Sequence, residues 1–159
     1  MKLEYSRANV LRGVLIYTSG DTIAALIMGE FLWTRMAGIM LVAATIYALE
    51  IPNYFSWIDR KSVNGHIAGK RTALALLYFN PLWIARHLLF ITLFSLKWNE
   101  IGLGLLLKGL YSFLVNIPLS LTANYIIQNK IALKWRFTAS AAFSALMAIY
   151  YPLSARLFK

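Results

Sequence analysis

The hydrophobic positions of this chain fall into five long runs that are separated by short polar segments. We expect membrane-crossing helices at about residues 10–32, 36–57, 72–95, 101–128 and 137–157, because roughly 20 apolar residues are needed to cross the hydrocarbon core of a bilayer. The short connections favour antiparallel neighbours in one bundle. The pattern therefore predicts an all-α, polytopic membrane helical bundle that forms a single integral membrane domain over residues 1–159.

Polar residues recur at every fourth position of the fourth run, and we call this set the stripe. Its members are Lys108, Ser112, Asn116, Ser120, Asn124 and Gln128. Residues four apart lie on neighbouring turns of nearly the same helix face. Hydrocarbon does not tolerate such polarity unless it faces protein or water. The stripe therefore predicts a polar path or a buried contact.

The stripe does not stay on one face of a straight helix. Each four-residue step overshoots a turn by about 40°, so the polar positions wind around the helix axis. Pro118 divides them into an outer arc, Lys108 to Asn116, and an inner arc, Ser120 to Gln128. Depth alone places Asp21 and Arg86 beside the outer arc and Glu50 beside the inner arc.

Composition agrees with a membrane protein. The chain is 60% hydrophobic with a mean hydropathy of +0.62, and 14% of its residues are charged, against roughly 25% in soluble domains. The net charge of +10 does not indicate nucleic-acid binding, because the basic residues cluster at the ends of the apolar runs. The absence of cysteine excludes disulfides, thiolate chemistry and cysteine metal sites.

The basic residues also predict the orientation of the chain. With the N-terminus in the cytoplasm, the inner side holds ten of them: Lys2, Arg7, Arg12, Arg60, Lys61, Lys70, Arg71, Lys130, Lys134 and Arg136. The outer side holds four: Arg35, Lys97, Arg156 and Lys159. Trp33, Trp98, Tyr150 and Tyr151 on the outer side, and Tyr5, Trp57 and Trp135 on the inner side, form the expected interfacial belts. Both patterns predict an N-in, C-out topology.

Asp21 interrupts the first run and no cleavage-like site follows, so we expect a retained helix rather than a signal peptide.

Charged residues inside the spans are the main candidates for function. A carboxylate near the middle of a span, such as Asp21, must be paired, protonated or hydrated. Arg86 and Lys108 lie at compatible depths and are its expected partners, whereas Glu30 is expected at the outer interface near Arg35. Three interpretations stay open: a structural ion pair, a path for a solute or proton, and snorkelling of Lys108 toward the surface.

Proton coupling is the second hypothesis for these residues. His87 can titrate near neutral pH, and Asp21 and Glu50 are the other candidates. Histidine and acidic residues do not occur at metal-ligand spacing in the sequence. We therefore expect neither a metal nor a cofactor.

Prolines interrupt three spans, at Pro52, Pro81 and Pro118. Each frees a backbone carbonyl and can kink its helix. Carbonyls freed beside Asn80, Asn116 or Asn124 could bind a polar solute, since broken helices at membrane depth are typical of transporter sites. In the fifth span, Ser140, Ser144 and Ala148 form a small-residue face that predicts close helix packing.

Short segments between residues 10 and 138 resemble a known family. They are Val14–Ser19, Thr34–Ile39, Pro52–Tyr54, Asp59–Arg60, Phe79–Pro81, Trp98–Ile101 and Asn116–Ser120. In these segments the chain resembles the small L-alanine exporter family of the bacterial inner (plasma) membrane. The resemblance implies ion-driven amino-acid efflux. The chain departs from that family in a shorter loop between the first two spans and in its fifth span.

A second set of residues is similar to another family. The set is Gly20-Asp21, Arg35, Trp57–Arg60, Asn124-Tyr125, Arg136 and Pro152–Ser154. It resembles the four-helix channel-like family of peroxisomal and mitochondrial inner membranes, although the Trp-Pro pair typical of that family's later helices is missing here.

These observations predict a membrane transporter for a small polar solute, with an amino acid such as alanine implied by the first resemblance. A non-catalytic accessory subunit of a larger membrane complex and a channel-like protein are the alternatives.

The sequence contains no nucleophile elbow, P-loop or dinucleotide-binding fingerprint, so we do not expect an enzyme. An enzyme for lipid or prenyl substrates would gather polar residues at one interface, whereas the stripe spreads through the membrane. The small size of one subunit is compatible with a homodimer.

Overall fold

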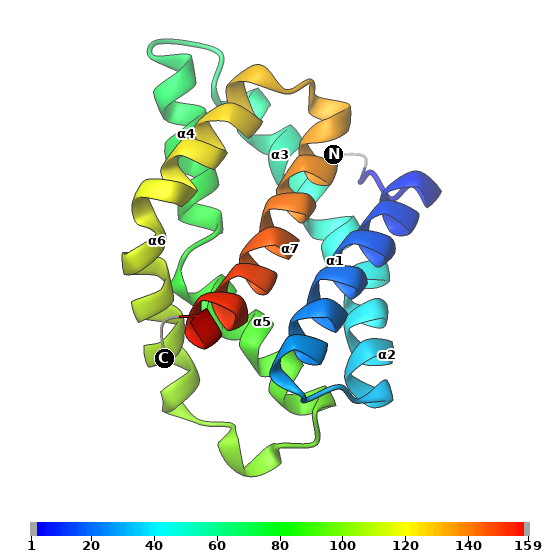
Figure 1. The fold of residues 1–159 in the computed structure, drawn as a ribbon. Helices are drawn as coiled ribbons and strands as arrows, with labels where there is room; N and C mark the ends of the chain where they lie inside the picture. The colour runs from blue at the N-terminus through cyan, green and yellow to red at the C-terminus, as the bar shows by residue number, and fades with distance from the viewer. Residues whose placement is uncertain (1–2, 158–159) are drawn as a thin grey trace.

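Long helices that run up and down form one bundle in the computed structural model (Figure 1). The structure describes the backbone of residues 3–157 and the side chains of residues 3–150. Lys2 and Lys159 lie outside the described residues, as do the side chains of Tyr151 and Arg156. The segments are α1 (Arg7–Met28), α2 (Trp33–Val42), η1 (Ala43–Tyr47), α3 (Ala48–Lys61), α4 (Ile67–Tyr78), α5 (Pro81–Phe94), η2 (Trp98–Glu100), α6 (Leu103–Lys130) and α7 (Leu133–Leu157). No strand occurs among the described residues, so the predicted all-α fold is confirmed.

The helices match the predicted spans except that the third span is divided. Segments α2, η1 and α3 form one continuous helix from Trp33 to Lys61, whereas α4 and α5 are two helices joined at residues 79–80. With α4 and α5 taken together, four helical segments of the described chain are long and apolar enough to cross a membrane: 7–28, 33–61, 67–94 and 103–130. The fifth, α7, has 25 residues, or about 37 Å at 1.5 Å per residue, against a hydrocarbon thickness of about 30 Å.

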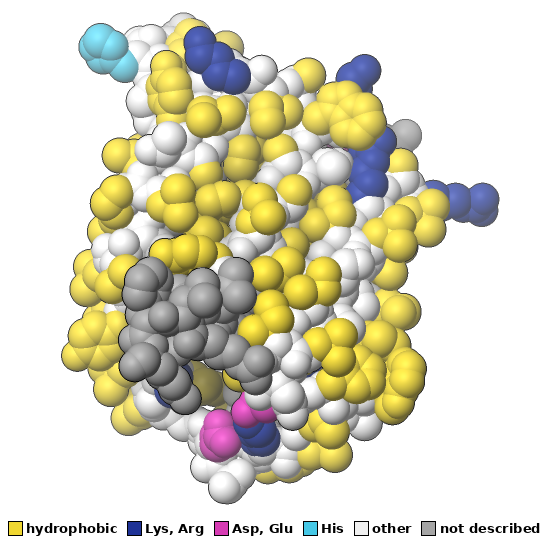
Figure 2. All heavy atoms as spheres, viewed as in Figure 1, with side chains coloured by type: hydrophobic (Ala, Val, Ile, Leu, Met, Phe, Trp, Pro, Cys, Tyr) yellow, Lys and Arg dark blue, Asp and Glu magenta, His cyan; other side chains and the backbone are white. Residues whose placement is uncertain are grey.

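Charge and polarity divide the surface along the helix axes. Apolar side chains cover the middle, and most of the Lys and Arg side chains visible in Figure 2 lie at its upper end. This end carries the start of α1, the 62–66 loop and the α6–α7 turn (Figure 1). It is the end that the positive-inside rule assigns to the cytoplasm, and we call it the inner end.

Local capping explains the first antiparallel pair. The Ser6 hydroxyl oxygen accepts the Asn9 N–H at 3.2 Å and begins α1. Gly29 ends α1 with φ 73°, and the Glu30 N–H donates to the Ala25 carbonyl at 2.9 Å. Such a left-handed cap favours glycine because no Cβ opposes it. A short turn to Trp33 then sends α2 back beside α1.

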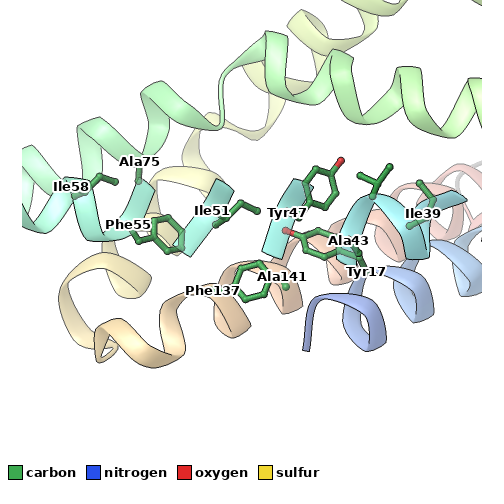
Figure 3. Packing of buried hydrophobic residues seen from close by; sticks show 11 residues of the cluster. Tyr17, Ile39, Ala43, Tyr47, Ile51, Phe55, Ile58, Ala75, Phe137 and Ala141 are labelled. Atoms are coloured by element: carbon green, nitrogen blue, oxygen red, sulfur yellow. The ribbon is translucent and has the colours of Figure 1, made fainter. Parts of the chain in front are cut away.

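The helix from Trp33 to Lys61 forms the centre of the core (Figure 3). Its buried apolar side chains recur every fourth residue: Ile39, Ala43, Tyr47, Ile51 and Phe55. In a plain α-helix this spacing would drift by about 160° over four steps. The π-helical turn η1 inserts about one extra residue and takes back about 100° of that drift. The row therefore keeps facing Tyr17 of α1, Ala75 of α4, and Phe137 and Ala141 of α7.

Pro52 gives a physical reason for this π-helical turn. It is buried inside α3, just beyond η1. Proline cannot donate to the carbonyl four residues earlier and its ring crowds that turn. The irregularity expected at Pro52 thus takes the form of a wide turn upstream rather than a break. By contrast, α6 continues through Pro118 as one helix.

Candidate functional site

Asp21 and Arg35 form an ion pair in the packed interior. The Nε and Nη2 atoms of Arg35 donate to the two carboxylate oxygens of Asp21 at 2.9 and 2.6 Å. The Asp21 side chain is only 5% exposed and the Arg35 side chain only 7%. A buried carboxylate requires such two-point pairing, because desolvation of either charge alone is expensive. The pair therefore links α1 to α2.

This geometry corrects the expected partners of Asp21. The prediction of Arg86 or Lys108 was wrong, and Arg35, which was counted among the outer basic residues, is buried in the protein. The tight turn after Gly29 makes α1 and α2 neighbours, and the long Arg35 side chain spans the remaining difference in depth. Lys108 is exposed on α6 and forms no ion pair among the residues whose side chains are described, which suits snorkelling.

Arg86 instead pairs with Glu50. The prediction that placed Arg86 beside the outer arc of the stripe and Glu50 beside the inner arc was therefore wrong. The Arg86 Nη1 atom lies 2.9 Å from one Glu50 oxygen and 3.1 Å from the other. The side chains are 32% and 35% exposed, far more than the Asp21–Arg35 pair. This ion pair joins the first turn of α3 to α5.

A pocket of about 320 Å³ surrounds the accessible part of this pair. Its lining residues are Glu50, Tyr54, Leu77, Tyr78, Asn80, Leu82, Trp83 and Arg86. They come from α3 and from both sides of the α4–α5 break. We call this hollow the Glu50–Arg86 pocket.

The α4–α5 break is stabilised by a single side chain. The Asn80 amide nitrogen donates to the Leu77 carbonyl at 2.9 Å, and its carbonyl oxygen accepts the Trp83 N–H at 3.0 Å. Asn80 thus caps the end of one helix and the start of the next. Pro81 occupies the first position of α5, where its missing N–H needs no partner. The sequence pair Asn80-Pro81 therefore encodes a helix break at membrane depth.

Replacing Asn80 with Ala is expected to lower the free energy of unfolding by about 1–2 kcal/mol, since helix caps contribute about this much. The Asn80→Asp variant keeps the acceptor for Trp83 and should lose less. Thermal unfolding in detergent measures both. Equal stability of Asn80→Ala and wild type would show that solvent or lipid replaces the cap.

His87 faces the core beside the pocket. Its Nδ1 atom lies 2.8 Å from the Tyr47 hydroxyl, and its ring stacks on Trp83 with centroids 5.9 Å apart. Tyr47 ends the π-helical turn, so this polar contact is held where the central helix is widest. The three proton-coupling candidates make separate contacts: His87 with Tyr47, Asp21 with Arg35, and Glu50 with Arg86.

The stripe on α6 passes from the surface into the protein. Lys108 is exposed; Ser112, Asn116 and Ser120 are half-buried; Asn124 and Gln128 are buried. The Asn116 and Asn124 amides donate to carbonyls of their own helix, Ser112 at 2.6 Å and Ser120 at 2.9 Å. Much of this polarity is therefore satisfied within α6, and none of the stripe residues lines the Glu50–Arg86 pocket.

A second charged cluster, at the inner end, was missed by sequence reasoning. Asp59 of α3 lies 2.6 Å from Arg136 of α7 and 3.1 Å from Arg71 of α4. Arg136 is buried, and its Nε also donates to the Ile131 carbonyl at 3.0 Å. From sequence, both arginines were used as topology signals, and Arg136 also in the second resemblance, but neither was paired with Asp59. Asp59, the single acid in the basic stretch 59–71, was the signal that could have identified the cluster.

At the outer end, Glu30 pairs with Lys97 at 3.1 Å rather than with Arg35. Both side chains are 39% exposed. This contact joins the α1–α2 turn to the segment that follows α5, and water can reach it.

Within the described residues, no three His, Asp or Glu side chains come together as a group that could hold a metal ion. Comparisons with protein-family models, with curated proteins and with solved structures gave no match. Function is therefore inferred from the geometry of the Glu50–Arg86 pocket and its surroundings.

Proposed function

We propose that this protein moves a small polar solute across a membrane and that the Glu50–Arg86 pocket is the solute site. The observation that carries the proposal is the contrast between the two deep ion pairs. Asp21–Arg35 is sealed from solvent, whereas Glu50–Arg86 is about one-third exposed in a pocket. A structural pair at membrane depth gains nothing from an adjoining hollow, but a binding pair requires one.

The helix break strengthens this proposal. The first turn of α5 lies at the pocket, because Asn80, Leu82 and Trp83 line it. The positive dipole end of a helix favours a carboxylate. Discontinuous helices place such ends at substrate sites in many transporters.

A zwitterionic amino acid is the solute class that this arrangement suits. Arg86 and the start of α5 would receive the carboxylate, and Glu50 would receive the ammonium group. A hollow of about 320 Å³ has room for a small amino acid such as alanine. The resemblance to the alanine exporters supports the same class and a bacterial inner-membrane location.

Of the three candidates for proton coupling, Glu50 suits the role best. Protonation of Glu50 would remove its charge and release Arg86, whereas Asp21 is held at two points by Arg35. His87 lies next to Arg86 in sequence and contacts Tyr47. A movement of the released Arg86 can therefore be passed to His87 although His87 does not contact the solute.

The test is efflux of radiolabelled alanine and a panel of other amino acids from proteoliposomes. Glu50→Gln is expected to reduce flux about tenfold or more, because a hydrogen bond to a charged group contributes about 1.5–3 kcal/mol. Glu30→Gln makes the same chemical change in the exposed outer pair and serves as the matched control.

The Asn116→Leu variant tests whether the solute instead follows the stripe on α6. Loss of flux in Asn116→Leu with full flux in Glu50→Gln would move the path to α6 and overturn the pocket assignment. Wild-type protein that transports no member of the panel, yet co-purifies with another membrane chain in mild detergent, would favour the accessory-subunit alternative.

A further inference from the structure

A second hollow lies on the outside of the bundle between α4 and α6, and we call it the α4–α6 groove. Its volume is about 470 Å³. It is lined by Gly69, Thr72, Ala73 and Leu76 of α4 and by Leu121, Thr122 and Tyr125 of α6. The α4 residues are spaced along one helix face, so the groove follows the seam between the two helices through the inner half of the membrane.

Small side chains on α4 make this groove. Gly69 and Ala73 place little side-chain volume on this face of α4, and a Cβ added at Gly69 would meet no atom within 4 Å. Leu121 and Tyr125 on the opposite wall are 46% and 44% exposed. A long, mostly apolar channel at this depth has the shape and polarity of a hydrocarbon chain.

The two walls are tied together at the inner end. The Asn129 amide of α6 donates to the Thr72 hydroxyl at 3.1 Å and to the Ala68 carbonyl at 3.3 Å. Thr72 in turn donates to the Ala68 carbonyl at 2.9 Å. The groove is therefore a fixed feature of the fold rather than a gap between independent helices.

Positive charge flanks this inner end. Lys70 directly follows Gly69, and Lys130 is the last residue of α6; both are exposed. Asp59, the one acid of the segment 59–71, is already shared by Arg71 and Arg136. The two lysines thus remain free of this acid, at the depth where lipid phosphates lie.

We propose that the α4–α6 groove binds an anionic phospholipid, with one acyl chain between α4 and α6 and the headgroup phosphate near Lys70 and Lys130. Basic sites between membrane helices on the cytoplasmic side attract anionic headgroups, and long lysine stems reach the interface from a helix end. The site is independent of the solute pocket, because the two hollows share no lining residue.

Native mass spectrometry of the purified full chain tests the proposal with equimolar phosphatidylglycerol and phosphatidylcholine. Wild type is expected to retain phosphatidylglycerol about thirtyfold better, since each of the two lysines near an anionic surface contributes about 1 kcal/mol. The double variant Lys70→Gln/Lys130→Gln should lose this preference. Lys61→Gln/Lys134→Gln removes two other exposed lysines of the same end and should keep it.

A groove-filling variant separates chain binding from surface charge. Ala73→Phe is expected to reduce retention of both lipids, because the ring occupies the space of the acyl chain. Equal retention of the two lipids by wild type, or equal losses in the two lysine pairs, would overturn the headgroup assignment. Unchanged lipid retention in Ala73→Phe would overturn the groove assignment.

Discussion

Replacing Arg35 with Met is expected to lower the free energy of unfolding by about 3–5 kcal/mol, the usual effect of removing one partner of a buried ion pair. The change leaves Asp21 without its two donors in a site that is almost closed to solvent. An unpaired carboxylate there must become neutral or draw in water. Thermal unfolding in detergent, followed by size-exclusion chromatography of the heated protein, measures the loss.

The double variant Asp21→Leu/Arg35→Met decides whether the charge or the shape of Arg35 matters. If the loss arises from the unpaired carboxylate, the double variant should be more stable than Arg35→Met alone. Lys97→Met breaks the exposed pair with Glu30 and should cost at most about 1 kcal/mol. Additive losses in the double variant, or a loss in Lys97→Met as large as in Arg35→Met, would contradict the assignment of a sealed structural pair.

The predicted spans and the α4–α5 break could be derived from sequence because each depends on local signals. Apolar length sets the spans, and Asn80 followed by Pro81 fixes where one helix must end. The central position of the helix 33–61 had no such signal. Its buried apolar residues have the same four-residue spacing as the polar stripe on α6. The π-helical turn keeps the apolar residues on one face, whereas the stripe winds around α6. Pro52 is visible in the sequence, but the one-dimensional pattern does not show that its irregularity takes the form of a wide turn rather than a kink.

Ion-pair partners could not be derived from depth for a related reason. Depth along the membrane normal is one coordinate, and several bases share a similar depth with Asp21. Which one it meets depends on which helices are neighbours and on the reach of an arginine side chain, which covers more than a helical turn. Asp21 therefore meets Arg35 across the shortest turn, and Arg86 is left for Glu50. The Glu50–Arg86 pocket is lined by this second pair, so it could not be predicted without the correct partners.

Replacing Gly20 with Leu is expected to lower the free energy of unfolding by about 3 kcal/mol, near the upper end of the usual cost of overpacking. A Cβ at Gly20 would lie 2.5 Å from the Ala145 Cβ and 2.8 Å from the Ala145 Cα. The second of these atoms belongs to the backbone of α7, so the collision cannot be relieved by rotating a side chain. A Cβ at Gly104 would meet no atom within 4 Å, so Gly104→Leu is the matched control in the same unfolding assay.

The alanine variants of the same two glycines give a sharper test, because they should change stability in opposite directions. Glycine in a helix costs up to about 1 kcal/mol relative to alanine, so Gly104→Ala, in the first turn of α6, should leave stability unchanged or raise it. Gly20→Ala should lower it, since the added methyl group separates α1 from α7. Removing the opposing methyl group in Gly20→Ala/Ala145→Gly should recover part of the loss. If both alanine variants stabilise the protein, α1 and α7 cross at a greater distance, and the small residues of α7 are there for a different neighbour.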